Sequence, residues 1–567
     1  MERKEIINHV IKKYGYKTYL EIGVAIPTMN YDLIECEHKE GCDPYTDDTF
    51  DFHYYGEEFA EECYKRITYR MTSDEMFASM APEKKFDFIF IDGLHTEEQV
   101  KKDILNSLDH LNPGGTIAVH DTIPHAEMFA REERVTDEWY GCVYRAILDF
   151  DKIGGRYASV RQENKNGITL IPYQTIYKWQ RAEFMKKSAF TYADYESDTD
   201  NRMHIVSLED FGKSVMIYHN SEYLNKPENR HFGSDGSLIF GGTESWVVGV
   251  AERLSKWAYD VTLFTDTLLG GILDITRYRQ RTSPDVYNHF DVAIVTTNIE
   301  VTKTLDCDKI ILIPTCEFFN TEFGAFAPAD RVGILSEWQR EWYHKTYSIN
   351  DGLMFRHFLP SEHNLYDNYK DYTKKNAMVW SSAPVRGLRF FVERVFPKIK
   401  AEIPDFELYI CGYNEAYYEK EWAKYVDGVH PMINASHGEL AELQKQAKIW
   451  VYPNIGRSET SGFFYETFCI TAVENALAGN AIVCFDKKDG ISSTIEGYDG
   501  FLDGDMFNTN DRNFMLHYEE AADILAERAI SILKDDEYRG HLSDTARKIC
   551  ERYTWDNEME IIRKEIS

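Results

Sequence analysis

The stretch ETFCITAVENALAG, residues 466–479, decides the fold of this chain. Its alanine-rich second half predicts a helix, and the glycine at its end marks the stop of that helix, because glycine is common just after a helix C-terminus. Short apolar segments that indicate buried strands lie on either side, at residues 448–453 and 481–485. Glu466 stands in the loop before the helix and Glu474 about one turn inside it. The stretch therefore predicts an α/β step whose loop N–H groups and helix dipole can hold a diphosphate.

The same alternation of strands and helices extends toward the N-terminus. In the same half, strands are predicted at residues 378–381 and 406–412. A second α/β half is predicted before residue 373, with strands at residues 214–218, 260–265, 291–296, 309–314 and 332–336. In that half Gly241 and Gly242 precede a helix, so their backbone N–H groups can face an anion. By itself, this pair is better explained by a tight turn with a threonine cap.

Residues 214–554 resemble retaining glycosyltransferases that have two Rossmann-like lobes, the GT-B architecture, of the family 4 type. Their signature is two glutamates separated by seven residues, here Glu466 and Glu474. The resemblance implies a nucleotide-sugar donor, with Glu466 accepting from sugar hydroxyls, Glu474 reaching the ribose and Arg386 facing the phosphates. The donor-binding residues expected on this basis are Gly241, Gly242, Arg386, Glu466, Thr467, Phe468, Cys469, Ile470 and Glu474. Arg386 and Glu466 are also the expected catalytic residues.

Two positions depart from that family. Ser381 and Arg386 stand where the family usually has an Arg and, five residues later, a Lys, so part of the positive charge must come from elsewhere or the enzyme is slow. The family often has a His of the first lobe close to the transferred sugar. The loosely matching segment here, PTCE at residues 314–317, contains no His, and we assign Glu317 no role.

A separate nucleotide-fold pattern lies near the N-terminus. Residues 20–24 indicate a buried strand that ends in a turn at Gly23, and Asp43 follows twenty residues later. In such folds the backbone approaches the ligand at the glycine, and the acid accepts from ribose hydroxyls. Two more strands, at residues 86–91 and 116–119, each end in polar side chains. Open α/β sheets bind ligands at the carboxyl ends of their strands, where these side chains are expected to gather.

This region resembles class I methyltransferases that are found beside surface-glycan genes. The resemblance rests on the runs at residues 20–24, 43–44, 71–75, 90–95 and 120–121, and on later matches at residues 139–141 and 146–147. It implies S-adenosylmethionine as methyl donor, bound by Glu21, Gly23, Asp43, Ser73 and Asp74. The second and third glycines that usually follow the first strand are absent, and AIPT, residues 25–28, stands in their place.

Methyl transfer to a sugar hydroxyl requires alignment with the sulfonium and removal of a weakly acidic proton. Asp92 and Asp121 can hold Mg²⁺, which lowers the pKa of the hydroxyl, as in related sugar methyltransferases. His95 or His120 is the alternative general base. His120 stands where an acid is often found, which makes the site less suited to a hard ion. A purely structural role remains the competing interpretation for both histidines, and Asp121 can instead cap the segment that follows its strand.

The chain is therefore expected to be α/β with three Rossmann-like units. The expected domains are a methyltransferase domain at residues 1–176, a linker at 177–212, and two transferase lobes at 213–372 and 373–567. The linker interpretation rests on aromatic residues among charges, without sheet periodicity, followed by an acidic stretch, and it predicts a helix followed by an exposed connector. Because the linker is not rich in Gly and Ser, we expect semi-rigid coupling.

Composition limits the class of partner. A formal net charge of −32 makes nucleic acid an improbable partner and disfavours an anionic membrane, although a local basic patch can still allow peripheral contact. Ten scattered cysteines without a Cys-x-x-Cys pair argue against a zinc ribbon, a redox motif or a disulfide framework. With no signal peptide and no apolar run of about 18 residues, a cytoplasmic location is expected.

The sequence thus predicts a bifunctional enzyme that transfers a sugar to a glycan acceptor and O-methylates a sugar hydroxyl. One alternative keeps the glycosyltransferase and treats the first domain as a binding module without catalysis, because its loop lacks glycines. Another is an inactive scaffold in glycan assembly, since Ser381 replaces a basic residue.

Overall fold

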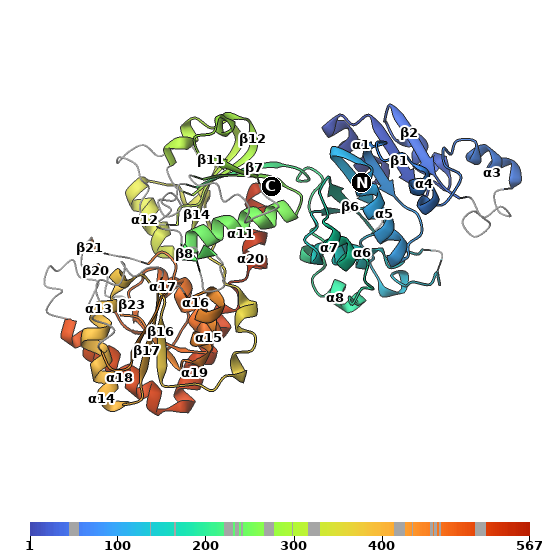
Figure 1. Cartoon of the computed structure of the whole chain (residues 1–567). Coiled ribbons are helices and arrows are strands. Elements are labelled where there is room, and N and C mark those ends of the chain that lie inside the picture. Colours follow the sequence, from blue (N-terminus) through green and yellow to red (C-terminus); the bar gives the residue numbers. More distant parts are fainter. Residues whose placement is uncertain are drawn as a thin grey trace. The chain divides into compact units, whose positions relative to one another are not determined.

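The computed structural model describes most of the 567 residues as two compact units (Figure 1). The described residues are 1–44, 56–136, 138–163, 166–219, 231–232, 238–239, 242–265, 277–296, 299–315, 329–412, 426–433, 435–453, 457–458, 462–463, 466–504 and 518–567. The first unit is Met1–Ser214 with Glu252–Val261, and the second is Val215–Ala251 with Thr262–Ser567.

The first unit is built on a six-stranded sheet in the order β2-β1-β3-β4-β6-β5. The strands, in chain order, are β1 (Thr18–Ile22), β2 (His38–Cys42), β3 (Phe86–Ile91), β4 (Leu111–Val119), β5 (Ala158–Arg161) and β6 (Gly167–Pro172). The first four run parallel, and β6 lies antiparallel to both β4 and β5. Because β2 and β3 lie on opposite sides of β1, the direction of winding reverses there, and ligands bind at such a switch point in open α/β sheets.

The helices of this unit bury apolar side chains against the sheet. Its longer helices are α1 (Arg3–Tyr14), α3 (Glu57–Tyr64), α4 (Ser73–Ser79), α5 (Glu97–Asp109) and α6 (Val143–Lys152). Side chains of α4, α5 and α6 share one apolar core with β1, β3 and β4. In α1 the side chains of Ile6, Ile7 and Val10 have no exposed surface. This helix is therefore anchored to the unit by its own apolar face.

Residues 177–212, which we expected to form a linker, pack as part of the first unit. They form α7 (Lys178–Phe184), α8 (Tyr192–Glu196) and α9 (Thr199–Arg202). Phe184, Tyr195 and Met203 belong to the same apolar core as the sheet. Burial of these single large side chains fixes three short helices that have no regular apolar face of their own.

The second unit begins with a seven-stranded sheet in the order β11-β10-β7-β12-β13-β14-β15. Its strands are β7 (Ser214–His219), β10 (Asp260–Thr265), β11 (Arg277–Gln280), β12 (Phe290–Val295), β13 (Cys307–Leu312), β14 (Arg331–Ile334) and β15 (Met354–Arg356). The pairs β10–β11, β7–β12, β12–β13, β13–β14 and β14–β15 are all parallel. Two long helices, α11 (Gly242–Lys256) and α12 (Glu337–Tyr347), accompany this sheet, and a short antiparallel pair joins β8 (His231–Phe232) and β9 (Leu238–Ile239).

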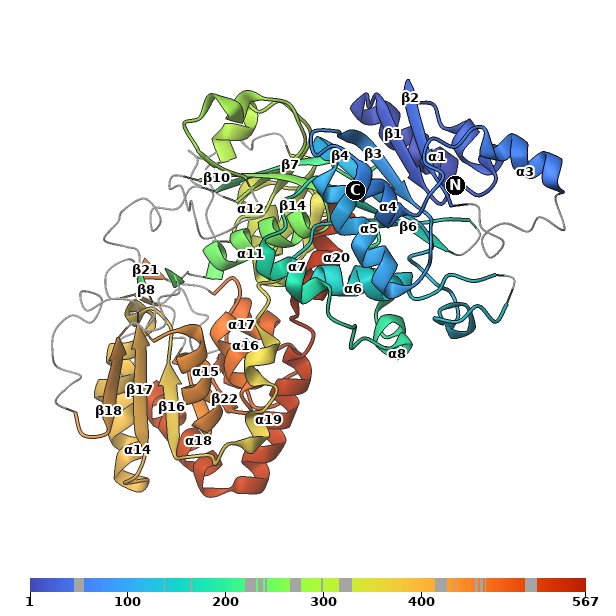
Figure 2. The ribbon, with the colours of Figure 1, turned by 45° about the vertical axis from the view of Figure 1, so that its right-hand side comes forward.

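A second α/β lobe follows, and β16, β17 and β18 lie side by side in it (Figure 2). Its parallel pairs join β16 (Ala377–Trp380), β17 (Glu407–Gly412) and β18 (Val429–Ile433), then β19 (Ile449–Val451) with β22 (Ala481–Val483), and β23 (Phe485–Asp486) with β24 (Leu502–Asp503). The main helices are α14 (Phe396–Glu402), α15 (His437–Gln446), α16 (Ile470–Leu477), α17 (Gly490–Thr494), α18 (Tyr518–Lys534) and α19 (Asp536–Cys550). The chain thus contains three Rossmann-like α/β units, as the sequence predicts.

The last helix, α20 (Trp555–Ile566), crosses back to the first lobe of the second unit. Its Glu558 has no exposed surface and accepts a 2.7 Å hydrogen bond from Trp246 Nε1 of α11. The same carboxylate lies 3.2 Å from His357 Nδ1 and accepts from the Phe358 amide at 3.1 Å. One buried carboxylate therefore satisfies three donors that belong to two different segments of the lobe.

Glu558→Ala is expected to lower the free energy of unfolding of the second unit by about 3 kcal/mol, because it leaves buried donors without an acceptor. Chemical denaturation followed by tryptophan fluorescence measures this change. Glu560→Ala, at an exposed position of the same helix, is the matched control and is expected to change stability by less than about 0.5 kcal/mol. Equal effects of the two substitutions would contradict the bridging role of Glu558.

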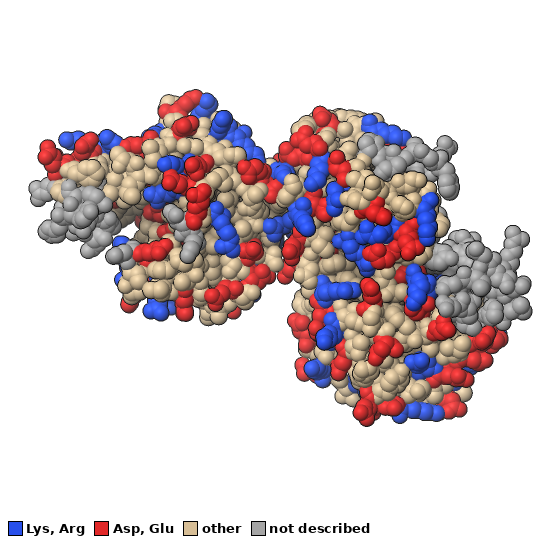
Figure 3. All heavy atoms as spheres, turned by 180° about the vertical axis from the view of Figure 1, so that it is seen from behind, with Lys and Arg blue, Asp and Glu red and all other residues tan. Residues whose placement is uncertain are grey.

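Acidic and basic side chains are interspersed over both units on the face shown in Figure 3. None of the helices in the described part of the chain combines the length and the apolar character that crossing a bilayer requires.

Candidate active sites

In the first unit, backbone hydrogen bonds bring the carboxyl ends of the parallel strands together. The Gly23 amide donates to Cys42 O at 2.9 Å, and the Asp92 amide donates to Ile22 O at 2.8 Å. Gly23 has a φ of +84°, and a Cβ there would lie 2.1 Å from the carbonyl oxygen of Asp92. Only glycine therefore fits this turn, which explains why the first glycine of the motif is present although the later ones are not.

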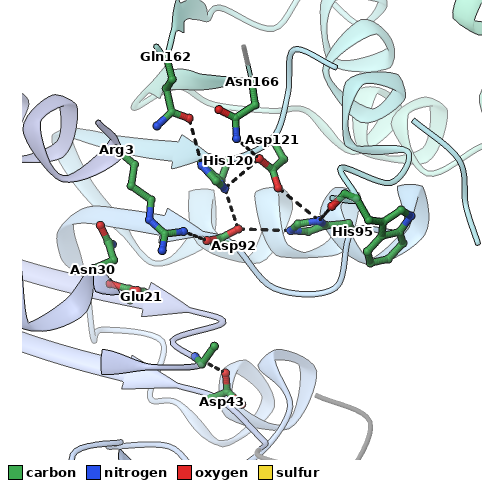
Figure 4. A network of polar contacts seen from close by, with 12 residues as sticks. Arg3, Glu21, Asn30, Asp43, Asp92, His95, His120, Asp121, Gln162 and Asn166 are labelled. Atoms are coloured by element: carbon green, nitrogen blue, oxygen red, sulfur yellow. Dashed lines mark hydrogen bonds and ion pairs between the residues drawn. The ribbon is translucent and has the colours of Figure 1, made fainter. Parts of the chain in front are cut away.

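Asp43 closes the turn that follows β1. Its Oδ2 accepts from the Ala25 amide at 2.9 Å, and Ala25 itself has a φ of +47° (Figure 4). The AIPT loop is thus held by a hydrogen bond to Asp43, the acid that follows β2. In a glycine-rich loop the conformational freedom of glycine allows the tight turn, and here this hydrogen bond stabilises it. Gly23 and Asp43, both expected to bind the methyl donor, are brought together.

Glu21 lies in a buried polar network. The Tyr19 hydroxyl and Asn30 Nδ2 both donate to its Oε2, at 2.6 and 3.1 Å. Burial raises the pKa of Glu21 to about 8, against the effect of these hydrogen bonds. At neutral pH this carboxyl is therefore largely protonated, and it supports the turn rather than adding a negative charge to the crevice.

Ser73 and Asp74 begin α4, where Thr72 caps the helix. Gln99 Nε2 donates to Ser73 Oγ, to Asp74 Oδ1 and to Asp103 Oδ1, each at 3.1 Å. Burial raises the pKa of Asp103 to about 6. Asp103 also lies near Gly93, which directly follows β3. These groups form a second polar cluster of the unit, and the sequence did not point to Gln99 or Asp103.

A network of charged side chains surrounds Asp92, directly after β3 (Figure 4). Its Oδ2 accepts from Arg3 Nη1 at 2.6 Å, while its Oδ1 lies 3.0 Å from His120 Nδ1 and 3.3 Å from His95 Nε2. Asp121, which has a φ of +57°, approaches the same two imidazoles: its Oδ1 lies 3.2 Å from His120 Nδ1 and its Oδ2 lies 3.6 Å from His95 Nδ1. The structure therefore joins all four residues that the sequence singled out here.

The hydrogen-bond partners of these groups come from distant segments. Gln162 Oε1 lies 3.1 Å from His120 Nε2, and Asn166 Nδ2 donates to Asp121 Oδ1 at 2.6 Å. Both residues belong to the segment that connects β5 and β6. Sequence reasoning identified neither of them, nor Arg3.

The charges and hydrogen bonds around His95 and His120 affect the pKa of the two side chains differently. Burial alone would lower the pKa of His120, but the charges of Asp92 and Asp121 and their hydrogen bonds raise it to about 10. Burial also opposes ionisation of Asp92, yet the charge of His120, the hydrogen bonds from both imidazoles and the charge of Arg3 hold the pKa of Asp92 well below its ordinary value. The pKa of His95 is raised against burial by the hydrogen bond to Asp92 and the charge of Asp121. At neutral pH His120 is thus a cation.

His95 is held from behind by the segment that follows β4. Its ring stacks on Trp139 with centroids 5.4 Å apart, and its carbonyl accepts from the Cys142 amide at 2.9 Å. A Cβ on Gly141, which has a φ of +61°, would lie 2.1 Å from the His95 carbonyl oxygen. The match noted at residues 139–141 therefore positions the imidazole.

In the second unit, Glu466 is the centre of a compact cluster. Only 2% of its surface is exposed, and its Oε1 accepts from Arg386 Nη1 at 2.9 Å and from the Tyr452 hydroxyl at 2.6 Å. The charge of Glu466 raises the pKa of Arg386 above its ordinary value although burial opposes this. Arg386 and Glu466, expected from the sequence to act together, are in direct contact, and Tyr452 is the partner that the sequence did not identify.

The loop that leads into α16 lies against the first lobe. Thr467 Oγ1 donates to Thr315 O at 3.0 Å, and Thr315 in turn lies 2.8 Å from the hydroxyl of Thr243. Phe468 is buried against the ring of Tyr553. Gly242 lies at the start of α11, where a Cβ would meet Ile470 Cγ2 at 3.9 Å. The N-termini of α11 and α16 therefore lie close together. Gly241 and Glu317 lie outside the described residues.

The sequence predicts that the backbone amides of the loop before α16 face a diphosphate, and the amide of Cys469 differs from this prediction. The Cys469 N–H donates to Thr494 Oγ1 at 3.1 Å, so this amide already has an acceptor within the protein. The Gly490 amide also bonds to Glu466 O at 2.6 Å, and a Cβ on Gly490 would lie 2.2 Å from that oxygen. The segment around α17 thus fixes the loop from behind.

Glu474 lies within α16 and faces α15, where Gln444 Nε2 lies 3.5 Å from its Oε2. Burial raises the pKa of Glu474 to about 7, and the hydrogen bond from Gln444 opposes this only in part. At neutral pH the side chain of Glu474 is therefore partly protonated.

Lys487 adds a cation that the sequence did not identify. It follows β23 and is 5% exposed. Burial lowers its pKa, while the charges of Asp489 and Glu466 oppose this, so its ammonium lies within electrostatic reach of Glu466. Ser381, which stands where a basic residue was expected, has a buried hydroxyl without a hydrogen-bond partner among the described residues.

Comparison with known proteins matches each unit to a family. The family described as "Methyltransferase domain" matches residues 18–122, and the family described as "Glycosyl transferases group 1" matches residues 376–535. No curated protein matches the chain.

Solved structures resemble part of the chain at low sequence identity. A glycosyltransferase from Rickettsia africae is 15% identical, with a TM-score of 0.44, and covers 62% of this chain and 98% of its own. Sucrose-phosphate synthase from Thermosynechococcus elongatus is 14% identical, with a TM-score of 0.45 and the same coverage of 62% and 98%. From the two family matches and the two-lobed fold of the second unit, this chain contains a methyltransferase domain followed by a glycosyltransferase domain of group 1 with the GT-B arrangement.

Proposed function

We propose that this chain is a bifunctional glycan-modifying enzyme. One domain transfers a sugar from a nucleotide-sugar donor to a glycan acceptor, and the other O-methylates a sugar hydroxyl with S-adenosylmethionine. The observation that carries the proposal is the Arg386–Glu466–Tyr452 cluster at the N-terminus of α16, accompanied in the same chain by the Asp92–His95–His120–Asp121 network. The proposed acceptor is a surface polysaccharide, a lipid-linked glycan or a glycoprotein, modified in the cytoplasm.

Sugar transfer requires the glycosidic bond of the donor to break while negative charge develops on the diphosphate. Arg386 and Lys487 supply positive charge beside Glu466, which compensates for Ser381. The N-terminal end of α16 adds its dipole. Glu466 accepts from hydroxyls of the sugar, and Gly242, Thr467 and Ile470 line the approach between the lobes, which we place at residues 213–372 and 373–567. The oxygen of an acceptor hydroxyl then bonds to the anomeric carbon, the bond from that carbon to the diphosphate breaks, and the hydroxyl proton passes to the departing nucleoside diphosphate. Retention of configuration and the family 4 type follow from the resemblance.

Glu474 is proposed to accept hydrogen bonds from the ribose of the donor. Because its pKa is raised to about 7, the carboxylate that accepts best is populated mainly above that pH. We expect the Kd for a nucleotide sugar to fall by up to about tenfold from pH 6 to pH 8. Isothermal titration calorimetry measures this directly, since the phosphodiester groups of a nucleotide sugar do not titrate in this range. Glu474→Gln should flatten the profile, and an unchanged pH dependence in that variant would refute the ribose assignment.

In the methyltransferase domain, Gly23 and Asp43 are proposed to hold the ribose of S-adenosylmethionine, with Glu21 supporting the turn and Ser73 and Asp74 on the adenine side. The sulfonium supplies the methyl group, which passes to a sugar oxygen and leaves S-adenosylhomocysteine. His95 takes the hydroxyl proton, because His120 already carries a proton at neutral pH and cannot accept another. Asp92 and Asp121 orient His95 and stabilise the imidazolium that forms.

Thermal stabilisation of the full chain tests both halves, because a ligand that binds only the folded state raises its apparent stability. S-adenosylhomocysteine and one of UDP, GDP and dTDP should each produce a shift, and Asp43→Ala should abolish only the first. A nucleotide shift without an adenosyl shift would refute the methyltransferase half and support a binding module. Absence of any nucleotide shift would refute the transferase half and favour a scaffold.

A further inference from the structure

Arg3 brings a guanidinium into the methyltransferase centre from an element outside the sheet (Figure 4). It is the first residue of α1, and its Nη1 lies 2.6 Å from Asp92 Oδ2. The helix is fixed, because Ile6, Ile7 and Val10 have no exposed surface. The N-terminal ammonium of Met1 also lies 2.8 Å from Glu163 Oε1, beside Gln162. The guanidinium is therefore held in place by a packed helix.

The remaining lone pairs of the two acids face other donors. Asp92 Oδ1 lies 3.0 Å from His120 Nδ1 and 3.3 Å from His95 Nε2. Asp121 Oδ1 accepts from Asn166 at 2.6 Å and lies 3.2 Å from His120 Nδ1. Every carboxylate oxygen but Asp121 Oδ2 is thus engaged by a donor at hydrogen-bonding distance.

Arg3 already provides Asp92 with a positive partner, because its guanidinium lies 2.6 Å from Asp92 Oδ2. His120 has acceptors at both ring nitrogens, the carboxylates at Nδ1 and Gln162 Oε1 at Nε2, so its Nδ1 faces the acids and not a metal. A divalent ion added here would meet the guanidinium of Arg3 in a largely buried place, which is strongly unfavourable.

These residues do not fit the Mg²⁺ ion that the sequence led us to expect at Asp92 and Asp121. Donor atoms of Asp92, His95 and Asp121 do lie within 4.8 Å of one another, a separation that a metal can span. Mg²⁺, however, requires about six oxygen ligands at roughly 2.1 Å, and an imidazole is a poor ligand for it. The oxygens it would need are those that Arg3 and His120 occupy.

We propose that Arg3 and His120 take the electrostatic place of a divalent ion in this domain, and that Arg3 keeps such an ion off Asp92. This inference rests on the proposed methyltransferase function for its catalytic meaning. It leaves His95, rather than a metal, to accept the proton of the hydroxyl.

The test uses Mn²⁺ as a probe on the full chain, because electron paramagnetic resonance distinguishes free from bound Mn²⁺. The wild type and Asp92→Asn should bind the same amount of Mn²⁺, which shows that no ion uses Asp92. Arg3→Ala should gain one Mn²⁺ site, with an affinity at least about tenfold higher than that of any Mn²⁺ bound by the wild type. Adding Asp92→Asn to Arg3→Ala should remove this site. Arg161→Ala is the matched control, since it removes an exposed ion pair with Asp200 of the same unit.

A wild-type Mn²⁺ site that Asp92→Asn abolishes would overturn the inference. So would Arg3→Ala protein that is folded by circular dichroism yet gains no Mn²⁺ site. If Arg3→Ala does not fold, Arg3→Met provides the same comparison with the apolar part of the side chain retained. Binding of S-adenosylhomocysteine by the wild type should also be unchanged in EDTA. Loss of that binding only in EDTA would contradict the inference, whereas no binding with or without EDTA would refute the proposed methyltransferase function instead.

Discussion

Glu466→Gln is expected to lower the rate of sugar transfer by a factor of about 10³ while leaving nucleotide binding nearly intact. The substitution keeps the shape of the side chain and removes its charge. Arg386 then loses the carboxylate 2.9 Å away, and Tyr452 loses a charged acceptor at 2.6 Å. The three groups would no longer be held in one geometry, and the sugar hydroxyls would lose a charged acceptor. Contacts made only in the transition state lower the rate without weakening ground-state binding.

The rate is measured as release of nucleoside diphosphate from the nucleotide sugar that stabilises the protein, with glycan present. Glu442→Gln is a closely matched control, because Glu442 also accepts from a tyrosine, Tyr372, and from a cation, Lys445, but at the surface of the same lobe. Tyr452→Phe separates positioning from charge and should reduce the rate by only about tenfold. Transfer by Glu466→Gln within about threefold of the Glu442→Gln rate would remove Glu466 from the mechanism.

Most of the parallel sheet framework is readable from local pattern. The apolar runs at 86–91 and 481–485 correspond to β3 (Phe86–Ile91) and β22 (Ala481–Val483). The glycine that marks the helix stop, Gly479, has a φ of +76°, and α16 ends two residues before it at Leu477. These features depend on side-chain periodicity and on backbone sterics, which a single sequence carries directly.

The partners of the catalytic candidates depend on tertiary contacts that periodicity does not encode. Arg3 meets Asp92 across 89 positions, and Asn166 meets Asp121 across 45. The second pair forms only because β5 and β6 fold back beside β4. In the sequence, Tyr452 is an ordinary residue at the end of a predicted strand. Its role depends on the loop before α16, which places Glu466 against its hydroxyl in the folded protein. The acids and histidines were therefore predictable by type and position, and the groups that set their charge were not.

The segment 177–212 shows the limit of reasoning from pattern in another way. Its helices have seven, five and four residues, too few turns to display an apolar stripe. Phe184 and Tyr195 are buried in the apolar core, and each is surrounded in the sequence by charged residues. The composition of the segment therefore resembles that of an exposed connector, although the segment packs against the sheet.

His95→Gln is expected to reduce methyl transfer by a factor of about 10³ and to leave the S-adenosylhomocysteine shift unchanged. Glutamine can still donate a hydrogen bond toward Asp92, so the network is kept while the group that accepts the proton is lost. His38→Gln is the control, since His38 is exposed at the start of β2, the opposite end of the sheet from the crevice. Formation of methylated glycan from labelled S-adenosylmethionine measures the rate.

The pH profile identifies His95 more sharply than the loss of rate alone. The pKa of His95 is raised above its usual value, so the neutral base is depleted at low pH and the rate should rise with pH through a value above 6.5. His120 keeps its proton until about pH 10, so it cannot produce that rise. Residual activity of His95→Gln should lack the acidic limb. If His95→Gln keeps the acidic limb of the pH profile, and the limb disappears only when His120→Gln is added, then His120 is the general base. His120 would in that case have to be neutral in the working enzyme.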